Sequence, residues 1–498
     1  MFLLGYDVGS SSIKATVLQA ETGLGISSAV SPTTDELDII AVKPGWAEQD
    51  PEVWWHHMKA ATAEMMAKTQ IDRSQIEAIG ISYQMHGLVV VDKDYRVLRP
   101  AIIWCDSRAV QIGEQAFNRL GSERCLAKFL NSPGNFTISK LKWVMENEPD
   151  VYSKIHKIML PGDYIAMKMT GDIVTTPSGL SEAILWDFEN QELAQLLLEH
   201  FGISADVIPE MVPTFSVQGE LSSTAADELG LRPGIKVAYR AGDQPNNALS
   251  LNVLNPGELA ATAGTSGVIY GVGSEPNYDA KSRVNTFVHV NHTPDNLRYG
   301  VLLCVNGTGI LNRWLRNNFV GNGRRLSYAE MNVLAAQTPV GSEGLVILPF
   351  GNGAERILEN RDVGGSVHGL RFNIHTRRHF LRAAQEGIVF ALNYGIEIMR
   401  EMGIKIDSVR AGYANMFLSP LFAETFATVT GAQVELYNTD GSQGAARGAG
   451  IGAAVYEEVA KAFVGLSSER VIEPNRALAA AYQEAYANWV HELEWNIN

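Results

Sequence analysis

The sequence is poor in cysteine, in long hydrophobic runs and in basic clusters. Its 498 residues contain three cysteines, Cys105, Cys125 and Cys304, and this odd, widely spaced set argues against a disulfide framework or a zinc site. No segment approaches the roughly 20 unbroken apolar residues of a membrane span. The first residues, MFLLGYDVGS, lack the basic lead and long apolar core of a secretion signal. We therefore expect a protein of the reducing cytoplasm with no membrane partner.

Positive charge is also in deficit. The chain has 55 Asp and Glu against 40 Lys and Arg, a formal net charge of −15, and no basic run that could follow a phosphate backbone. Nucleic acid is therefore not an expected partner. An anionic ligand would have to be bound locally by backbone N–H groups or a metal ion, because the net charge repels it.

Length and pattern predict two α/β domains. A chain of 498 residues exceeds what one hydrophobic core usually supports. Strand-like and helical segments alternate, as they do in α/β folds. Two hairpins, within residues 2–23 and 256–275, lie about 255 residues apart and suggest two similarly built domains. We place the boundary near residues 245–257.

The tips of both hairpins consist of small residues. The first reads Gly9-Ser10-Ser11-Ser12 and the second reads Gly264-Thr265-Ser266-Gly267. Small residues let backbone N–H groups approach a nucleotide phosphate and hydroxyls add donors, although either tip alone could be an ordinary tight turn. The Walker sequence of P-loop proteins is absent. Asp7, at the end of the first strand, could hold Mg²⁺ or could be a solvent-facing acid.

Polar and aromatic residues follow other predicted strands. Gln84, Met85 and His86 lie between two strands, and Trp104 and Asp106 end a third. Such a set suits a polyhydroxylated sugar, because each hydroxyl needs a donor or acceptor and the carbon chain needs an apolar platform. For His86 alone, a structural role is the common alternative.

The segment YRAGDQPNNAL, residues 239–249, places Asp243 between a glycine and the start of a predicted helix. The residue could be a helix cap or a catalytic group, and the two interpretations are compatible. A helix N-terminus favours the ionised carboxylate and weakens it as a base.

The order of motifs along the chain resembles that of the FGGY carbohydrate kinase family, most closely its xylulokinase branch. The motifs cover roughly residues 3–455 and read GYDVGSSSIK (5–14), PGWAEQDPEVWW (44–55), QMHG (84–87), LRPAIIWCDSR (98–108), SKLKWVMENEP (139–149), AGDQ (241–244), GELAATAGTSG (257–267), GGSVHGLRFNIHTRRHFLRAAQEG (364–387) and DGSQGAARGAG (440–450).

The resemblance implies an α/β fold of two actin-like ATPase (ribonuclease H-like) domains with the active site in the cleft between them. The expected domains are residues 1–247, with the sugar site and the catalytic base, and residues 257–455, with the ATP site, followed by a helical tail over 456–498. The expected reaction transfers the γ-phosphoryl group of ATP, with Mg²⁺, to the terminal hydroxyl of a pentulose. The pentulose expected first is D-xylulose. A homodimer is a plausible assembly.

The resemblance also implies roles for individual residues. Asp243 would be the catalytic base, and Asp7 would position Mg²⁺. The sugar would be bound by Gln84, Met85, His86, Trp104, Asp106 and Gln244. The nucleotide would be bound by Ser10, Ser11, Gly264, Thr265, Ser266, Gly412 and Asn415.

Two positions depart from the family pattern. Gln244 stands where the xylulokinase branch usually has Asn, and in this residue the chain is closer to glycerol kinases. The Arg-Glu pair of glycerol kinases, however, is absent at QMHG. Ala411-Gly412-Tyr413 replaces the usual three glycines of the adenosine loop. The alternatives are a kinase for L-xylulose, ribulose or glycerol, and a non-catalytic nucleotide-switched protein of the actin type.

Overall fold

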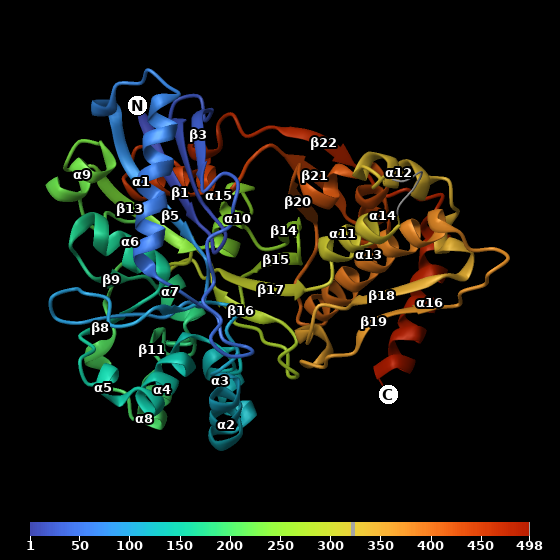
Figure 1. Ribbon diagram of the computed structural model, residues 1–498, viewed down its shortest axis with the longest axis horizontal. Coiled ribbons are helices and arrows are strands. Elements are labelled where there is room, and N and C mark those ends of the chain that lie inside the picture. The colour runs from blue at the N-terminus through green and yellow to red at the C-terminus, as the bar shows by residue number, and fades with distance from the viewer. Residues whose placement is uncertain (320–323, 498) are drawn as a thin grey trace. The chain divides into compact units, whose positions relative to one another are not determined.

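The computed structural model describes residues 1–319 and 324–497, and its chain forms two compact units (Figure 1). Unit 1 comprises Met1–Leu254, Thr286–Tyr299 and Thr439–Leu466. Unit 2 comprises Asn255–Asn285, Gly300–Asn438 and Ser467–Asn498. Each unit has one large mixed sheet with helices packed on it.

Unit 1 is built on a five-stranded sheet of order β13-β5-β1-β2-β3. β1 (Phe2–Val8) and β2 (Ile13–Gln19) pair antiparallel, which confirms the first predicted hairpin. β3 (Gly25–Ser31) continues this antiparallel edge, whereas β5 (Ile76–Tyr83) and β13 (Lys236–Gly242) extend the sheet in parallel. The parallel strands β1, β5 and β13 therefore end at one edge. Asp7 is the last residue but one of β1, and Gln84 and Asp243 directly follow β5 and β13.

Helices cover both faces of this sheet. Gly5 and Tyr6 are neighbours on β1, so they face opposite sides. The Tyr6 hydroxyl lies 2.8 Å from Thr62 Oγ1 of α1 (Pro51–Ala67), in the buried interior. On the other side Gly5 contacts α15 (Gly441–Gly452), where a Cβ on Gly5 would stand 1.9 Å from the Ser442 carbonyl oxygen.

Helix α1 forms where the sequence predicts it. Asp50 caps the helix, since its Oδ1 accepts a hydrogen bond from the Glu52 N–H at 3.0 Å, and Pro51 takes the first helical position. The predicted apolar stripe is buried, and it consists of Trp54, Met58, Ala61 and Met65.

The assignment of helix α15 to a unit differs from the predicted domain division. Residues 439–466 belong to unit 1, whereas the prediction placed 257–455 in one domain. The sequence of α15, GSQGAARGAGIG, is rich in small residues. A Cβ on Gly80 of β5 would stand 2.0 Å from the Ala445 carbonyl oxygen, so helix and strand backbones are in direct contact. This contact brings the start of α15 close to Asp7.

The remaining helices of unit 1 are α2 (Val110–Leu120), α3 (Ser122–Phe129), α4 (Thr137–Asn147), α5 (Pro149–Tyr152), α6 (Pro161–Thr170), α7 (Pro177–Glu182), α8 (Gln195–Phe201), α9 (Ser223–Leu229) and α10 (Asp243–Ser250). Short strands pair two by two, namely β4 (Glu48–Gln49) with β7 (Ala101–Ile102), β6 (Val89–Val91) with β8 (Lys157–Met159), β9 (Val174–Thr175) with β12 (Glu210–Met211), and β10 (Trp186–Asp187) with β11 (Glu192–Leu193). β16 (Asn285–Val288) also falls mainly in unit 1.

In unit 2 the strand order is β17-β15-β14-β20-β21-β22. β14 (Glu258–Ala263) and β15 (Gly267–Gly273) pair antiparallel, which confirms the second predicted hairpin. The other strands are β17 (Tyr299–Val305), β20 (Ser408–Gly412), β21 (Gln433–Tyr437) and β22 (Ser468–Ile472), with a separate pair of β18 (Val346–Phe350) and β19 (Gly364–His368). The helices are α11 (Gly309–Asn318), α12 (Tyr328–Ala336), α13 (Arg377–Glu401), α14 (Pro420–Thr430) and α16 (Ala479–Ile497).

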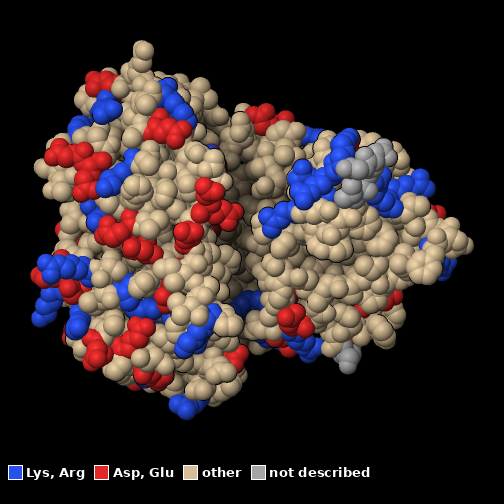
Figure 2. All heavy atoms as spheres, viewed as in Figure 1, with Lys and Arg blue, Asp and Glu red and all other residues tan. Residues whose placement is uncertain are grey.

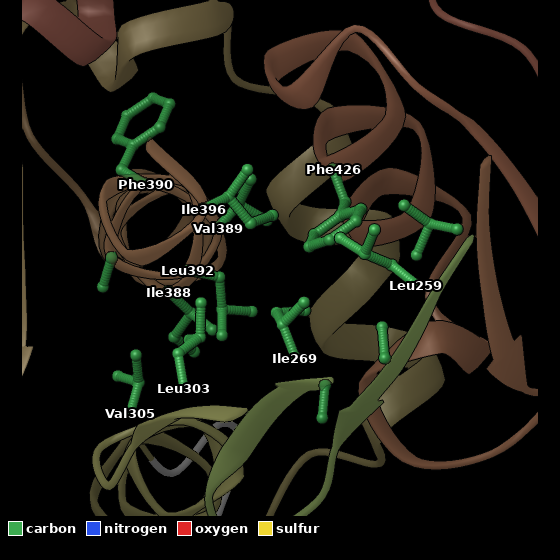
Figure 3. Packing of buried hydrophobic residues seen from close by; sticks show 14 of the residues in the cluster. Leu259, Ile269, Leu303, Val305, Ile388, Val389, Phe390, Leu392, Ile396 and Phe426 are labelled. Carbon is green, nitrogen blue, oxygen red and sulfur yellow. The ribbon is translucent and has the colours of Figure 1, made fainter. Parts of the chain in front are cut away.

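The core of unit 2 forms around the long helix α13. Figure 3 shows its Ile388, Leu392 and Ile396 side chains pointing toward Leu303 and Ile269 of the sheet. Helix α16 joins the same core through Trp489, whose Nε1–H donates to the Ile347 carbonyl at 3.0 Å. The segment predicted as a helical tail, 456–498, therefore also contains β22 and packs as part of unit 2 from Ser467 onward.

The surface of unit 1 agrees with the composition. On the face drawn in Figure 2, Lys and Arg are interspersed with Asp and Glu over unit 1 and form no continuous basic band there. Among the described helices, none is long and apolar enough to cross a membrane.

Candidate active site

Asp243 is the first residue of α10, directly after β13. Gly242 occupies the N-cap position, so the Asp243 side chain is not the cap of this helix. The Gln244 side-chain amide donates to Asp243 Oδ2 at 3.2 Å. Desolvation by the surrounding protein and the nearby charge of Asp7 raise the pKa of the Asp243 carboxyl to about 7. The lowering of this pKa that a helix N-terminus would cause is thus outweighed. The Asp243 carboxyl can therefore act as a base near neutral pH.

Asp7 lies beside Asp243 at the same edge of the sheet. The Ser82 hydroxyl donates to Asp7 Oδ1 at 2.8 Å. Burial raises the pKa of the Asp7 carboxyl, and the negative charge of Asp440 adds to this effect. Lys14 forms an ion pair of 2.8 Å with Asp440. The remaining negative charge around Asp7 and Asp243 favours a bound cation, although the described residues contain no group of three or more His, Cys, Asp or Glu in metal-binding range.

The first hairpin tip is held by hydrogen bonds to its backbone. The Gly9 N–H donates to the Ser12 carbonyl at 3.0 Å, and the Leu37 N–H donates to the Ser11 carbonyl at 2.9 Å. The Ser10 carbonyl accepts from Gln49 Nε2 at 2.7 Å. These hydrogen bonds hold the main chain of the tip, and the phosphate-binding role of Ser10 and Ser11 stays a prediction.

Gln49 connects this tip to the predicted sugar residues. Its Oε1 accepts from Gln84 Nε2 at 3.2 Å and from Trp54 Nε1 at 3.0 Å. Gln84 Oε1 is buried and has no hydrogen-bond partner in the described part of the chain. A buried unpaired amide oxygen suits a ligand hydroxyl. Sequence reasoning missed Gln49, although it lies within the quoted segment PGWAEQDPEVWW.

The turn after β5 places Met85 and His86. Met85 packs against Gly242, whose added Cβ would stand 2.5 Å from Met85 Cγ. His86 has φ of 60° and its Nδ1 lies 2.9 Å from the Glu182 carbonyl, which can only accept, so Nδ1 carries the proton. In the neutral ring Nε2 is then an acceptor, as a sugar hydroxyl requires.

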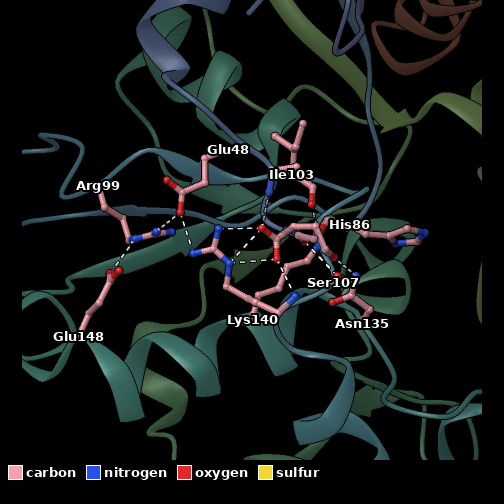
Figure 4. A network of polar contacts seen from close by, with 12 residues as sticks. Glu48, His86, Arg99, Ile103, Ser107, Asn135, Lys140 and Glu148 are labelled. Atoms are coloured by element: carbon pink, nitrogen blue, oxygen red, sulfur yellow. Dashed lines mark hydrogen bonds and ion pairs between the residues drawn. The ribbon is translucent and has the colours of Figure 1, made fainter. Parts of the chain in front are cut away.

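A buried lysine fixes the same turn. Lys140 Nζ donates to the His86 carbonyl at 2.8 Å and to the Ile103 carbonyl at 3.0 Å, and Figure 4 shows it reaching between the two segments. Burial lowers the pKa of Lys140 to about 7, against the opposing charge of Asp106. No sequence signal separated this lysine from surface lysines, because its carbonyl partners lie 54 and 37 residues away.

Asp106 is fully buried and its two carboxylate oxygens are engaged. Arg108 Nη2 donates to Oδ2 at 2.7 Å, Arg108 Nε to Oδ1 at 3.0 Å, and the Ala47 N–H to Oδ2 at 2.6 Å. Figure 4 shows the network continuing from Arg108 to Glu48 and Arg99. A sugar hydroxyl would have to compete with these hydrogen bonds. The geometry therefore indicates a mainly structural role for Asp106.

Trp104 is 52% exposed, and its Nε1–H donates to Ser10 Oγ at 3.3 Å. The indole face is therefore open to a ligand close to the hairpin tip. Trp104, Gln84, His86 and Asp243 all come from unit 1, where the structure gathers the predicted sugar residues.

In unit 2 a cavity of about 340 Å³ opens at the second hairpin tip. Its lining includes Gly264, Thr265 and Asn415 of the predicted nucleotide residues. The Gly309 N–H donates to the Gly264 carbonyl at 2.8 Å, which joins the tip to the start of α11. Ser266 and Gly412 lie in the same tip and at the end of β20, but they do not line this cavity.

Other lining residues were not predicted. Asn312 and Arg313 of α11, with Tyr328 and Asn332 of α12, present polar and aromatic groups to the cavity. Asn312 and Arg313 follow Gly309 at helical spacing of three and four, which is the signal that could have found them.

Comparison with known proteins decides the family. Residues 2–250 match the N-terminal domain of the FGGY family of carbohydrate kinases, and residues 259–456 match its C-terminal domain. The chain belongs to the FGGY family of carbohydrate kinases. As an FGGY kinase it is an ATP-dependent carbohydrate kinase, and its substrates are a sugar and ATP.

Relatives of this FGGY kinase match nearly its whole length. A xylulose kinase of Bacillus subtilis (strain 168) is 31% identical over 472 residues, which cover 93% of this chain and 91% of that protein. A solved structure described as a xyloylose kinase from Brucella ovis aligns with a TM-score of 0.89 at 27% identity, covering 99% and 98% of the two chains. Glycerol kinase from Plasmodium falciparum with ADP shares the fold, with a TM-score of 0.88 at 20% identity over 100% and 98%. The predicted fold class, α/β with two actin-like ATPase domains, is confirmed.

Proposed function

We propose that this FGGY kinase transfers the γ-phosphoryl group of ATP to the terminal hydroxyl of D-xylulose, giving D-xylulose 5-phosphate, in the cytoplasm. The observation that carries this proposal is the xylulose kinase relative from Bacillus subtilis, which matches along 93% of the chain. The site in unit 1 supports it, because an acid with a pKa of about 7 lies among polar side chains that suit sugar hydroxyls.

Asp243 is the proposed catalytic base. Its carboxylate accepts a hydrogen bond from the terminal hydroxyl and holds the oxygen in line with the γ-phosphorus. The new O–P bond forms as the bond to the ADP oxygen breaks, and the hydroxyl proton passes to Asp243. In a largely dissociative transfer this proton leaves late, so positioning contributes as much as basicity.

Asp7 would hold Mg²⁺, and the donor set fits this ion. A hard carboxylate supported by the Ser82 hydroxyl lies where neighbouring acids favour a cation. Mg²⁺ neutralises charge on the transferring phosphoryl group when it is bound. The hydroxyls and N–H groups of the two hairpin tips would bind the phosphates, and the ATP contacts are Ser10, Ser11, Gly264, Thr265, Ser266, Gly412 and Asn415.

The sugar contacts are proposed as Gln84, Met85, His86, Trp104, Asp106 and Gln244. Gln84 Oε1 and His86 Nε2 act as acceptors for hydroxyls, and Trp104 gives the apolar platform. Asp106 acts mainly by holding the 103–108 segment in place.

A coupled ADP-release assay over ketopentoses, ketohexoses and polyols tests the proposal. D-xylulose is expected to give the highest kcat/KM of the panel. A higher value for L-xylulose, ribulose or glycerol would keep the kinase assignment and replace the sugar. No stimulation by any compound would favour the non-catalytic actin-like alternative.

A further inference from the structure

Glu182 is a buried carboxyl group that the roles above leave unexplained. It is the last residue of α7 and is 1% exposed. Its main-chain carbonyl accepts the hydrogen bond from His86 Nδ1 at 2.9 Å. Ser181, the preceding residue, fixes the end of α7, since its Oγ accepts from the Val288 N–H at 2.9 Å. Glu182 is therefore held by its backbone next to the sugar residues.

The Glu182 carboxyl packs against the backbone that carries Asp243. A Cβ on Gly242 would stand 2.4 Å from Glu182 Oε2. Gly242 is in contact with this oxygen and is followed directly by Asp243. A movement of the Glu182 side chain would therefore displace Gly242 and, with it, the adjacent Asp243.

The buried Glu182 carboxyl has few hydrogen bonds to support a negative charge. Within the described residues, neither Glu182 carboxyl oxygen nor the Tyr83 hydroxyl makes a hydrogen bond of ordinary geometry. The His86 N–H and the Tyr83 hydroxyl are nevertheless close enough to interact with the carboxyl. Both groups can donate to a carboxylate and would lower the pKa of Glu182, but this effect is smaller than that of burial.

The titratable groups around Glu182 and its immediate neighbours carry charges of both signs. They come from six segments and are Tyr83 (β5), His86 (the following turn), Lys140 (α4), Asp163 (α6), Arg240 (β13) and Asp243 (α10). Arg240 Nη1 lies 3.5 Å from Asp163 Oδ1 and offsets that charge. Burial raises the pKa of Glu182 well above its usual range, and the negative charge of Asp243 adds to the effect.

On the basis of the proposed function, we propose that Glu182 is a positioning residue. As a neutral carboxylic acid it joins the His86 turn to the end of β13 and keeps a second negative charge away from Asp243. Ionisation would place a second negative charge beside Asp243 and would oppose the anionic phosphoryl group as it approaches the acceptor hydroxyl.

Two substitutions separate this role from a packing role. E182A removes the contact with Gly242, and kcat/KM for the sugar is expected to fall by about 10²-fold, as for a displacement of about 1 Å at the reacting groups. E182Q keeps the shape and cannot ionise, so it restores kcat/KM to within about 5-fold of the wild-type value. E182Q also abolishes the decline of kcat/KM at alkaline pH that ionisation of Glu182 produces.

The matched control is Glu123→Gln on α3, an exposed acid, which keeps the wild-type pH profile. An alkaline decline caused by loss of the Lys140 proton would persist in E182Q. The proposal is overturned if E182Q is as impaired as E182A, or if its alkaline decline is unchanged.

Thermal unfolding tests the protonation of the Glu182 carboxyl in the absence of a sugar. A carboxyl with a raised folded pKa stabilises the fold below its unfolded pKa, and this stability is lost as pH rises through the folded pKa. The Tm of the wild type should therefore fall relative to that of E182Q as the pH rises above the ordinary pKa of a glutamic acid, about 4.3. A constant Tm difference overturns the neutral-acid assignment, whereas inactivity of the wild type on every sugar overturns the proposed function alone.

Discussion

Gly441, at the start of α15, touches Asp7 more closely than a side chain allows. A Cβ at residue 441 would stand 2.4 Å from Asp7 Oδ2 and 2.7 Å from Asp7 Cγ. Ordinary contacts between non-bonded heavy atoms lie at about 3.5–4.0 Å. Gly441→Ala therefore displaces the Asp7 carboxylate by about 1 Å.

This displacement should act on catalysis more than on folding. A shift of about 1 Å at a reacting group can cost about 10²-fold in rate, so we expect kcat to fall by about that factor. The Mg²⁺ concentration for half-maximal rate should rise, because Asp7 is the proposed ligand. Alanine is better than glycine in a helix by about 1 kcal/mol, which offsets part of the overlap in the free energy of unfolding.

The assay is sugar-dependent ADP release over a Mg²⁺ series, with thermal unfolding measured alongside. Gly25→Ala is the matched control. A Cβ on Gly25 would stand at an ordinary 3.7 Å from Thr16 Cγ2, and its other neighbour, Gln443, belongs to the same helix α15. A wild-type rate and Mg²⁺ dependence in Gly441→Ala would refute the reasoning, as would an equal loss in Gly25→Ala.

Three further predictions concern unit 1. Gly5→Ala should lower the free energy of unfolding by about 1–3 kcal/mol or more in urea titration, because its Cβ meets the backbone of α15. Asp106→Asn should cost about 3–5 kcal/mol by the same measurement, because it leaves the buried Arg108 with Glu48 as its one remaining anionic partner among the described residues. The kcat/KM for the sugar should rise with pH through about 7 as Asp243 ionises, and the midpoint should move to lower pH as Mg²⁺ at Asp7 favours the ionised form.

The outcomes against these predictions are equally definite. Gly5→Ala fails as a test of α15 packing if Gly25→Ala loses as much stability. Asp106→Asn contradicts the structural role if it raises only the KM for the sugar, and the exposed Asp94→Asn serves as its control. A pH profile that stays flat well below 7 would show that Asp243 is not the group that titrates.

Local patterns predicted the parts of the fold that local chemistry determines. Asp50 and Pro51 mark the start of α1, and small residues mark the tips of both hairpins. The position of α15 was not predicted, because it depends on contacts between Gly5 and Ser442, which are separated by more than four hundred residues. Glycine and alanine in α15 give helix propensity and no indication of which unit they approach.

The same limit applies to the site. Asp7, near the end of β1, and Asp243, directly after β13, could be selected from their place at strand ends. The pKa of Asp243 could not, since it depends on burial and on Asp7, which lies in a distant part of the sequence. Asp106 has the sequence context of a sugar ligand, but Arg108 two residues later occupies it. Glu182 carried no sequence signal, because its partners come from six separate segments.

The measurement that tests the central claim most directly is D-xylulose-dependent ADP release by the wild type and by Asp243→Asn. The account predicts that D-xylulose stimulates the wild type and that the substitution lowers kcat by about 10²–10⁴-fold, the range for loss of a general base. Near-normal release by Asp243→Asn, or a wild type that D-xylulose does not stimulate, would contradict it.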